Sequence, residues 1–184
     1  MIFVWVLSVV LAVIILAVTV TYNQFIKLQN LIKEAWSGID VQLKRRHDLI
    51  PQLVEAVRAY AGHEKNLFEN VTKTRSSAIA AGSSDEKTGA ENALSGGLRK
   101  LFAVAEAYPQ LKASENYLEL QKSLVTVEDE LQLARRYYNG TVRDWNVALQ
   151  TFPSSLVGGL FKFRPAVFFE IETATQRENP SAKV

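Results

Sequence analysis

The N-terminal segment is the feature that most constrains the fold, because Ile2 to Val20 contains no charged residue. Only Ser8 and Thr19 interrupt its apolar composition, and the first charged side chain is Lys27. At about 1.5 Å per residue, a helix of this length covers about 28 Å, which matches the hydrocarbon thickness of a bilayer. The segment therefore predicts a membrane-spanning helix, within which every backbone amide is satisfied.

A cleaved signal peptide is the alternative interpretation of this segment. It is disfavoured because a basic n-region is missing, the apolar run exceeds the usual length of about 7 to 15 residues, and Ala17 with Thr19 is a poor cleavage pair. We therefore predict an uncleaved anchor over residues 1–21. Lys27 and Lys33 follow the span, whereas only the terminal amine precedes it, which favours an outside N-terminus and a cytoplasmic domain.

Charge and cysteine content exclude several classes of function. The net charge is +2, with 21 basic and 19 acidic residues, so nucleic-acid binding is not expected. The chain has no cysteine, which excludes disulfides and thiolate metal sites.

After the anchor, the apolar pattern is helical throughout, and no alternating stretch predicts a sheet. The clearest pattern is a heptad seam from Tyr117 to Phe152, which predicts a long helix from about Ser114 to Pro153 that continues through Asn139-Gly140. A second long helix is predicted from Thr21 to Ala61, with a kink at Pro51. Two shorter helices, at 63–81 and 84–107, are predicted between them, with Ser83 and Glu86 forming a capping box.

These elements predict an all-α protein in which a transmembrane helix precedes an antiparallel four-helix bundle of two long and two short helices. The predicted bundle covers residues 22–152. Residues 153–175 are aromatic-rich and are expected to pack near the membrane-proximal end. Residues 176–184 are polar, and we expect this tail to be disordered.

No catalytic or metal-binding pattern is present in the sequence. The Glu-x-x-His pairs of di-iron bundles are absent, as are His-Glu-x-x-His, Gly-x-Ser-x-Gly and phosphate-binding glycine loops. His47 and His63 each precede a carboxylate, but neighbouring residues on a helix do not face each other, so both are interpreted as surface or capping residues. We expect no cofactor, no bound metal and no enzymatic activity.

A polar patch interrupts the apolar seam of the first long helix. It contains Asp40, Gln42, Arg46 and Asp48. The candidate partners on the last helix are Glu128, Arg135, Arg136, Asn139, Arg143 and Asn146. The favoured interpretation is an interhelical network of hydrogen bonds and ion pairs that fixes helix register. A polar groove that binds a ligand is the alternative.

Four motifs resemble the LemA family of bacterial membrane-anchored proteins. They are AWSGIDVQLKRRHDLIPQLVEAVRAYAGHE from Ala35, VAEAYPQLKA from Val104, RRYYNGTVRDWN from Arg135 and FPSSL from Phe152. Gln52 departs from the Asn that is usual in the family, and Phe25-Ile26 replaces a small aliphatic pair. The resemblance implies a single N-terminal span in the bacterial inner membrane, a short outside N-terminus and an antiparallel helical bundle. It brings no assigned reaction and no catalytic residue.

Three hypotheses about function follow. The leading one is a non-enzymatic membrane-tethered scaffold that binds copies of itself or protein partners that the sequence does not identify; its candidate contacts are Trp36, Phe161, Phe163, Phe168 and Phe169. The second is binding at the membrane interface through the same C-terminal aromatics, with Lys162 and Arg164 facing anionic headgroups. The third, an enzyme or metal protein built on the region of Arg46, Asp48 and Glu64, is disfavoured because ligand spacing is missing.

Overall fold

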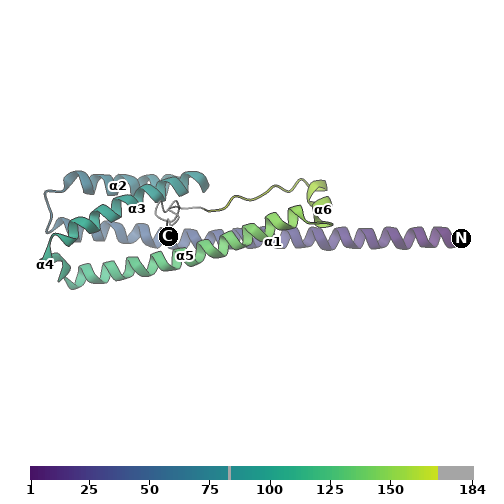
Figure 1. Ribbon diagram of the computed structural model, residues 1–184, viewed down its shortest axis with the longest axis horizontal. Helices are drawn as coiled ribbons and strands as arrows, with labels where there is room; N and C mark the ends of the chain where they lie inside the picture. The colour runs from purple at the N-terminus through teal and green to yellow at the C-terminus, as the bar shows by residue number, and fades with distance from the viewer. Residues whose placement is uncertain (83, 170–184) are drawn as a thin grey trace, which may run out of the picture. The chain divides into compact units, whose positions relative to one another are not determined.

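The computed structural model describes residues 1–82 and 84–169, and every regular element among them is helical (Figure 1). The elements are α1 (Ile2–Arg58), α2 (Lys65–Ala80), α3 (Ser84–Glu106), α4 (Pro109–Lys112), α5 (Glu115–Gln150) and α6 (Ser154–Leu160). The all-α prediction is confirmed for this part of the chain. The predicted tail at 176–184 and residues 170–175 of the aromatic segment lie outside the described residues.

The chain forms two compact units, to which both long helices contribute. Among the described residues, the first unit comprises residues 1–41 and 132–168, and the second comprises residues 42–131 and Phe169. The start of α1 and the end of α5 therefore belong to the first unit. The end of α1, α2, α3, α4 and the start of α5 belong to the second.

Helix α1 is one element of 57 residues that begins with the apolar segment. It is long and apolar enough at its N-terminal end to cross a membrane, and no residue of that apolar window is buried inside the protein. The helix continues past Pro51, as expected, and ends at Arg58 rather than at Ala61. Early termination places Ala61 and Gly62 in the turn that leads to α2.

The second unit is built around the α2–α3 hairpin, whose two helices lie side by side and run in opposite directions (Figure 1). Its core takes residues at helical spacing from each element: Ile50, Leu53, Val54 and Val57 from α1; Phe68, Val71 and Ala78 from α2; Leu94, Leu98, Leu101 and Ala105 from α3; Leu111 from α4; Tyr117, Leu120 and Leu124 from α5. A Cβ at Gly97 would lie 3.3 Å from Cγ2 of Val71, so a glycine here permits close approach of α3 to α2.

The boundaries of the later helices test the remaining expectations. Helix α5 continues through Asn139-Gly140, as the unbroken seam predicts. Helix α3 ends at Glu106, just before Tyr108-Pro109, but Pro109 then begins the unpredicted short helix α4. The backbone N–H of Gly82 donates to a carboxylate oxygen of Glu86 at 3.1 Å. Glu86 thus caps the start of α3, whereas Ser83 lies outside the described residues.

Candidate functional site

The first unit contains an aromatic cluster directly after the apolar segment of α1. The Phe25 ring centre lies 5.5 Å from that of Trp145 on α5 and 5.0 Å from that of Phe163, and Tyr22 lies 4.6 Å from Phe161. Phe25 and Trp145 are almost completely buried. Edge-to-face and tilted contacts at these distances are favourable, and they join the end of the predicted span to the C-terminal segment.

The segment after α6 is held against α5 by hydrogen bonds between α5 side chains and the backbone of the segment. Lys162 adopts a left-handed conformation with φ of 57°, and the following residues then run along α5. Trp145 Nε1 donates to the carbonyl of Arg164 at 2.8 Å, and the Asn146 amide both donates to and accepts from the backbone of Ala166 at 3.0 and 2.9 Å. The segment is therefore fixed by side chains of α5, although it has no regular secondary structure.

Tyr138 completes this set of contacts. Its hydroxyl donates to the carbonyl of Val167 at 3.0 Å, and its ring meets that of Trp36 with centres 5.3 Å apart. Burial raises the pKa of the Tyr138 hydroxyl above its ordinary value, because the phenolate would lose hydration. Tyr138 is thus held as a neutral donor.

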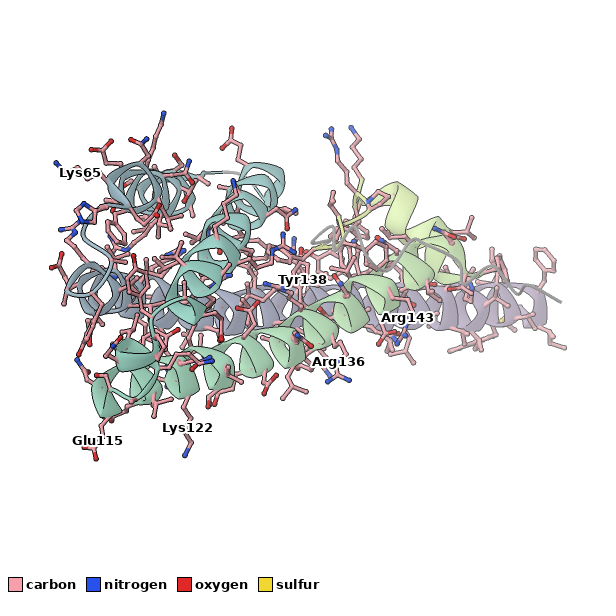
Figure 2. The ribbon with its side chains drawn as sticks, turned by 60° about the vertical axis from the view of Figure 1, so that its left-hand side comes forward. Lys65, Glu115, Lys122, Arg136, Tyr138 and Arg143 are labelled. Carbon is pink, nitrogen blue, oxygen red and sulfur yellow. The ribbon has the colours of Figure 1, made fainter. Side chains whose placement is uncertain are left out.

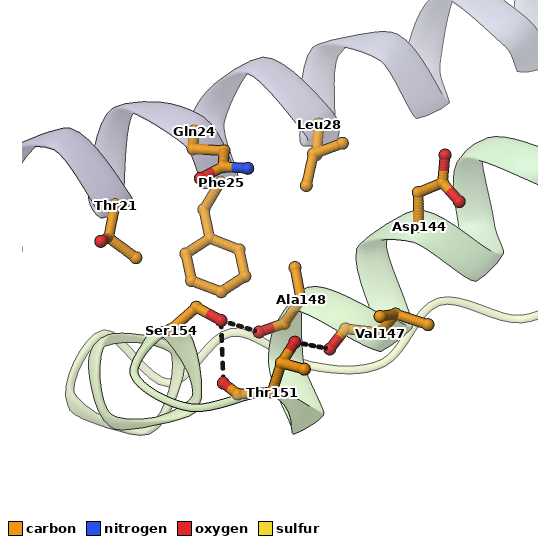
Figure 3. Close-up of a pocket in the computed structure, with 9 residues that line it drawn as sticks. All are labelled: Thr21, Gln24, Phe25, Leu28, Asp144, Val147, Ala148, Thr151 and Ser154. Atoms are coloured by element: carbon orange, nitrogen blue, oxygen red, sulfur yellow. Dashed lines mark hydrogen bonds between the residues drawn. The ribbon is translucent and has the colours of Figure 1, made fainter.

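A groove of about 420 Å³ lies beside the aromatic cluster (Figure 3). It begins at Thr21, the residue after the predicted span, and its apolar floor includes Phe25, Leu28 and Ala148. Gln24, Asp144, Val147, Thr151 and Ser154 also line it. The Ser154 hydroxyl donates to the carbonyl of Ala148 at 2.7 Å, and the Thr151 hydroxyl donates to the carbonyl of Val147. Both hydroxyl protons are therefore used in hydrogen bonds to the backbone of α5.

The second unit contains a buried cluster of charged groups. Arg46 Nη1 donates to Glu91 Oε2 at 2.9 Å and Nη2 donates to Ser95 Oγ at 2.7 Å. The other oxygen of Glu91 lies 2.7 Å from His47 Nε2. Arg46 Nε lies 3.4 Å from a partly exposed carboxylate oxygen of Glu128, and Arg75 donates to the His47 carbonyl at 2.6 Å. This cluster joins α1, α2, α3 and α5 within one unit.

These polar contacts have the character of a structural network. Each carboxylate oxygen of Glu91 has a cationic or imidazole partner, and Glu91 itself is buried, with 1% of its surface exposed. Among residues 1–82 and 84–169, no group of three or more His, Asp or Glu side chains is arranged to hold a metal ion. Contacts of this kind between four helices can fix helix register.

A sequence profile of the LemA family matches residues 35–183, which is most of the chain. The chain belongs to the LemA family. The apolar N-terminal helix and this LemA membership together point to a membrane protein.

Curated relatives of this LemA-family chain include magnetosome proteins. It is 24% identical to Magnetosome protein MamQ 1 of Paramagnetospirillum magneticum and to Magnetosome protein MamQ of Magnetospirillum gryphiswaldense, over 83% of this chain and 66% of each relative. It is 28% identical to Protein LemA of Metamycoplasma hominis, over 73% of this chain and 62% of the relative. The chain thus spans slightly less than two thirds of these curated relatives. None of the three names denotes a reaction.

The residues predicted as a polar network fall in different places. Arg46 and Gln42 belong to the second unit, where Arg46 is buried and its partners come from α3 and α5; Asp48 of the same unit is exposed. Asp40, Arg135, Asn139 and Arg143 belong to the first unit, where Arg143 is exposed and pairs with Asp144 at 3.1 Å. Arg46 contacts Glu91, Ser95 and Glu128, and of these three the sequence analysis anticipated only Glu128.

His47 is a correction to the sequence interpretation. It was expected on the surface or at a helix cap, but it exposes only 8% of its surface and contacts Glu91. A signal was present: the seam through Ile39 and Leu43 continues to Arg46, His47 and Ile50 at spacings of three and four. Glu91 likewise lies three residues before Leu94 and seven before Leu98, so the same spacing places it on the buried line of α3.

The aromatic residues predicted as an interaction surface also separate into two groups. Phe161 and Phe168 expose 46% and 41% of their surface. Trp36 and Phe163 are half-buried in contacts with other rings, and Phe169 is buried. Trp145 fills the core, as its place in the seam predicts. Only Phe161 and Phe168 therefore present an open face.

Proposed function

We propose that this LemA-family protein is a non-enzymatic, membrane-anchored helical scaffold that assembles with copies of itself and binds protein partners. The continuity of α1 carries the proposal. Its apolar N-terminal segment, which is not buried inside the protein, continues without a linker to Phe25, Ala35 and Ile39, which are buried in the first unit. A folded surface joined directly to an anchor stays close to the bilayer, where confinement raises its effective concentration for partners.

The use of polar side chains supports a non-enzymatic role. The strongest buried interactions, between Arg46, His47 and Glu91, join helices to one another. The side chains of Trp145, Asn146 and Tyr138 likewise donate hydrogen bonds to backbone carbonyls of the C-terminal segment.

The finer architecture and topology are part of the proposal. Helices α1, α2, α3 and α5 would form an antiparallel four-helix bundle, with the C-terminal segment near the membrane-proximal end. The anchor would span the bacterial inner membrane once, with the N-terminus outside and the helical domain in the cytoplasm. Lys27 and Lys33 after the span support this orientation through the positive-inside rule.

Thiol labelling tests the orientation directly, because the natural chain has no cysteine. A Lys122→Cys variant carries an exposed thiol on α5 (Figure 2). With a membrane-impermeant maleimide, labelling only after cell lysis is expected. Labelling in intact cells would place the domain outside and overturn the proposed orientation.

Self-assembly is tested on the full chain in lipid nanodiscs and in mild detergent. Its mass, measured by light scattering or mass photometry across the nanomolar to micromolar range, is expected to correspond to more than one copy. A strictly monomeric chain in both environments would overturn the self-assembling scaffold.

Binding at the membrane interface is a second candidate function, favoured by the position of Phe161. This ring is exposed, contacts Tyr22 beside the predicted span, and is followed by the exposed cations Lys162 and Arg164. Aromatic rings and cations in this arrangement suit the headgroup region of an anionic bilayer.

An environment-sensitive dye at Phe161→Cys of the full reconstituted chain tests this candidate. A blue shift that grows with the anionic lipid content is expected if the segment enters the interface. The matched control is Ser37→Cys, an exposed position on α1. Equal spectra at the two positions in all lipid mixtures would reject the interface role.

A further inference from the structure

The outer face of α5 in the first unit carries apolar residues at heptad spacing. Leu133 and Val147 expose 56% and 52% of their surface, and Gly140 lies midway between them. Residues seven apart on a helix lie within about 20° of one line. Scattered exposed apolar residues are ordinary on protein surfaces, but here they follow a single line over about 21 Å of helix.

Gly140 is a helix-interior glycine that packing among residues 1–82 and 84–169 does not require. A Cβ built at this position meets nothing within 4 Å, and glycine costs a helix interior about 1 kcal/mol relative to alanine. Gly97 differs, because α2 packs against it. A small residue on an exposed helical line leaves room for close approach of another helix.

The residues that flank this line repeat with the same period of seven. Arg136 and Arg143 lie on one side, and Tyr137 and Asp144 lie on the other. Tyr137 is half exposed, while the side chains of Arg143 and Asp144 expose 68% and 57%. Figure 2 shows the labelled Arg136 and Arg143 projecting away from α5, opposite to the buried Tyr138. One flank is therefore cationic, and the other offers an aromatic ring and a carboxylate.

The predicted anchor restricts how two copies can meet. Trp36 contacts Tyr138 whereas the earlier Phe25 contacts the later Trp145, so α5 runs antiparallel to α1 in this unit. Copies anchored in one membrane with the same topology have parallel α1 helices, and their α5 helices are then parallel too. A twofold axis along the membrane normal brings equivalent positions of the central line together and opposes the two different flanks.

We propose that the face of α5 formed by Leu133, Arg136, Tyr137, Gly140, Arg143, Asp144 and Val147 is a parallel, twofold contact with a second copy of this chain. Gly140 meets Gly140 of the second copy at the closest approach, and Leu133 and Val147 form apolar layers on either side. Arg143 faces Asp144 of the second copy, and Arg136 faces Tyr137 as a cation–π pair. A second copy of this chain fits the face because its cationic flank meets the flank that carries Tyr137 and Asp144. This inference rests on the proposed self-assembly and specifies its interface.

Cysteine cross-linking of the full chain in native membranes tests the register. Leu133→Cys and Val147→Cys, made separately in the cysteine-free chain, are each expected to form a self-linked dimer on mild oxidation. Ser37→Cys on the exposed face of α1 reports the background from random collisions. Products no stronger than this background would overturn the interface. A dominant mixed Leu133→Cys to Val147→Cys product, detected with tags of different size, would overturn the parallel register.

A charge-swap pair separates contacts between copies from the Arg143–Asp144 contact within one chain. Arg143→Asp makes both positions acidic, and Asp144→Arg makes both basic, so each variant alone should cross-link at Leu133→Cys about two- to fivefold less. Co-expression of the two variants should restore cross-linking between differently tagged copies. Failure of co-expression to restore it would contradict the proposed flanks.

Gly140→Leu tests the closest approach, and Gly38→Leu is its matched control. A Cβ at either glycine meets nothing within 4 Å, so both variants should keep the helical circular dichroism of the parent. Cross-linking at Leu133→Cys is expected to disappear only with Gly140→Leu, and its survival would overturn the inference. An oligomeric chain that lacks these cross-links rejects this interface alone, whereas a monomeric chain rejects the self-assembling scaffold as well.

Discussion

The guanidinium of Arg46 lies 2.9 Å from the carboxylate of Glu91, and neither side chain exposes more than 3% of its surface. The second oxygen of Glu91 contacts His47, so two adjacent residues of α1 share one carboxylate of α3. A buried ion pair is costly to desolvate, and its loss on one side leaves an uncompensated charge. This pair therefore makes the register between α1 and α3 sensitive to single substitutions.

Glu91→Ala is expected to destabilise the protein by about 3 to 5 kcal/mol, because Arg46 would stay charged and buried without its principal partner. For a chain of this size, the melting temperature should fall by at least about 6 °C. Differential scanning fluorimetry or calorimetry of the full chain in detergent micelles measures the shift.

Glu130→Ala is the control for Glu91→Ala. Glu130 pairs with Arg45 at 3.1 Å, but both side chains are largely exposed, at 43% and 58%. An exposed pair contributes at most about 1 kcal/mol, so the control should change the melting temperature little. Equal losses for the two variants would contradict a special role for the buried pair.

The double variant Arg46→Met with Glu91→Leu should recover much of the stability that Glu91→Ala loses, because it removes both buried charges together.

The sequence predicts the helices of this protein far better than their contacts. Heptad spacing around Leu131, Tyr138 and Trp145 was sufficient to extend α5 through Asn139-Gly140, because local periodicity determines which face is buried. The pairing of Arg46 with Glu91 joins residues 45 positions apart, and it depends on the relative register of α1 and α3. Periodicity within one helix carries no information about that register.

The C-terminal segment shows a second limit of sequence reasoning. Trp145, Asn146 and Tyr138 bind the backbone of residues 164–167, and a backbone carbonyl has no side-chain signature. Helix α6 was not predicted because Gly158-Gly159 favours a loop by propensity. Packing overrides that propensity, since Val157 and Gly158 are buried.

Gly158→Ala is expected to destabilise the first unit by about 1 to 3 kcal/mol through overpacking. A Cβ at this position would lie 2.9 Å from Cδ2 of Leu149, which must shift, and 3.4 Å from Cζ of Phe25, which confines the space beside it. The neighbouring Gly159 has nothing within 4 Å of such a Cβ, and Gly159→Ala should be neutral or slightly stabilising. Thermal unfolding of the two variants provides the comparison, and a milder effect at Gly158 than at Gly159 would refute the packing argument.

Asn146→Ala is expected to loosen the attachment of residues 163–167 to α5 without unfolding the helices. The substitution removes the paired hydrogen bonds with Ala166, worth about 0.5 to 1.5 kcal/mol each, and leaves the Trp145 contacts in place. Faster trypsin cleavage after Lys162 is the expected readout. Arg143→Ala, an exposed change on the same helix, is the control, and cleavage at the parental rate in Asn146→Ala would count against this anchoring role.

The stability of the protein should fall above about pH 10, partly through Tyr138. Burial raises the pKa of this hydroxyl, so in the folded state it keeps its proton at a pH where the unfolded chain has lost it. The unfolded state then binds fewer protons, and the free energy of unfolding decreases as pH rises from about 10 toward the folded-state pKa, with no contribution below that window. The pKa of Tyr117 is raised in the same direction by burial and by Glu106, so it adds to this slope.

Tyr138→Phe should cost about 0.5 to 1.5 kcal/mol at neutral pH through loss of the hydrogen bond to Val167, yet show a shallower alkaline decline than the parent. Melting temperatures of both proteins across the alkaline range test this expectation. Lysine titration is common to both and cancels in the comparison, so parallel declines would show that Tyr138 does not contribute.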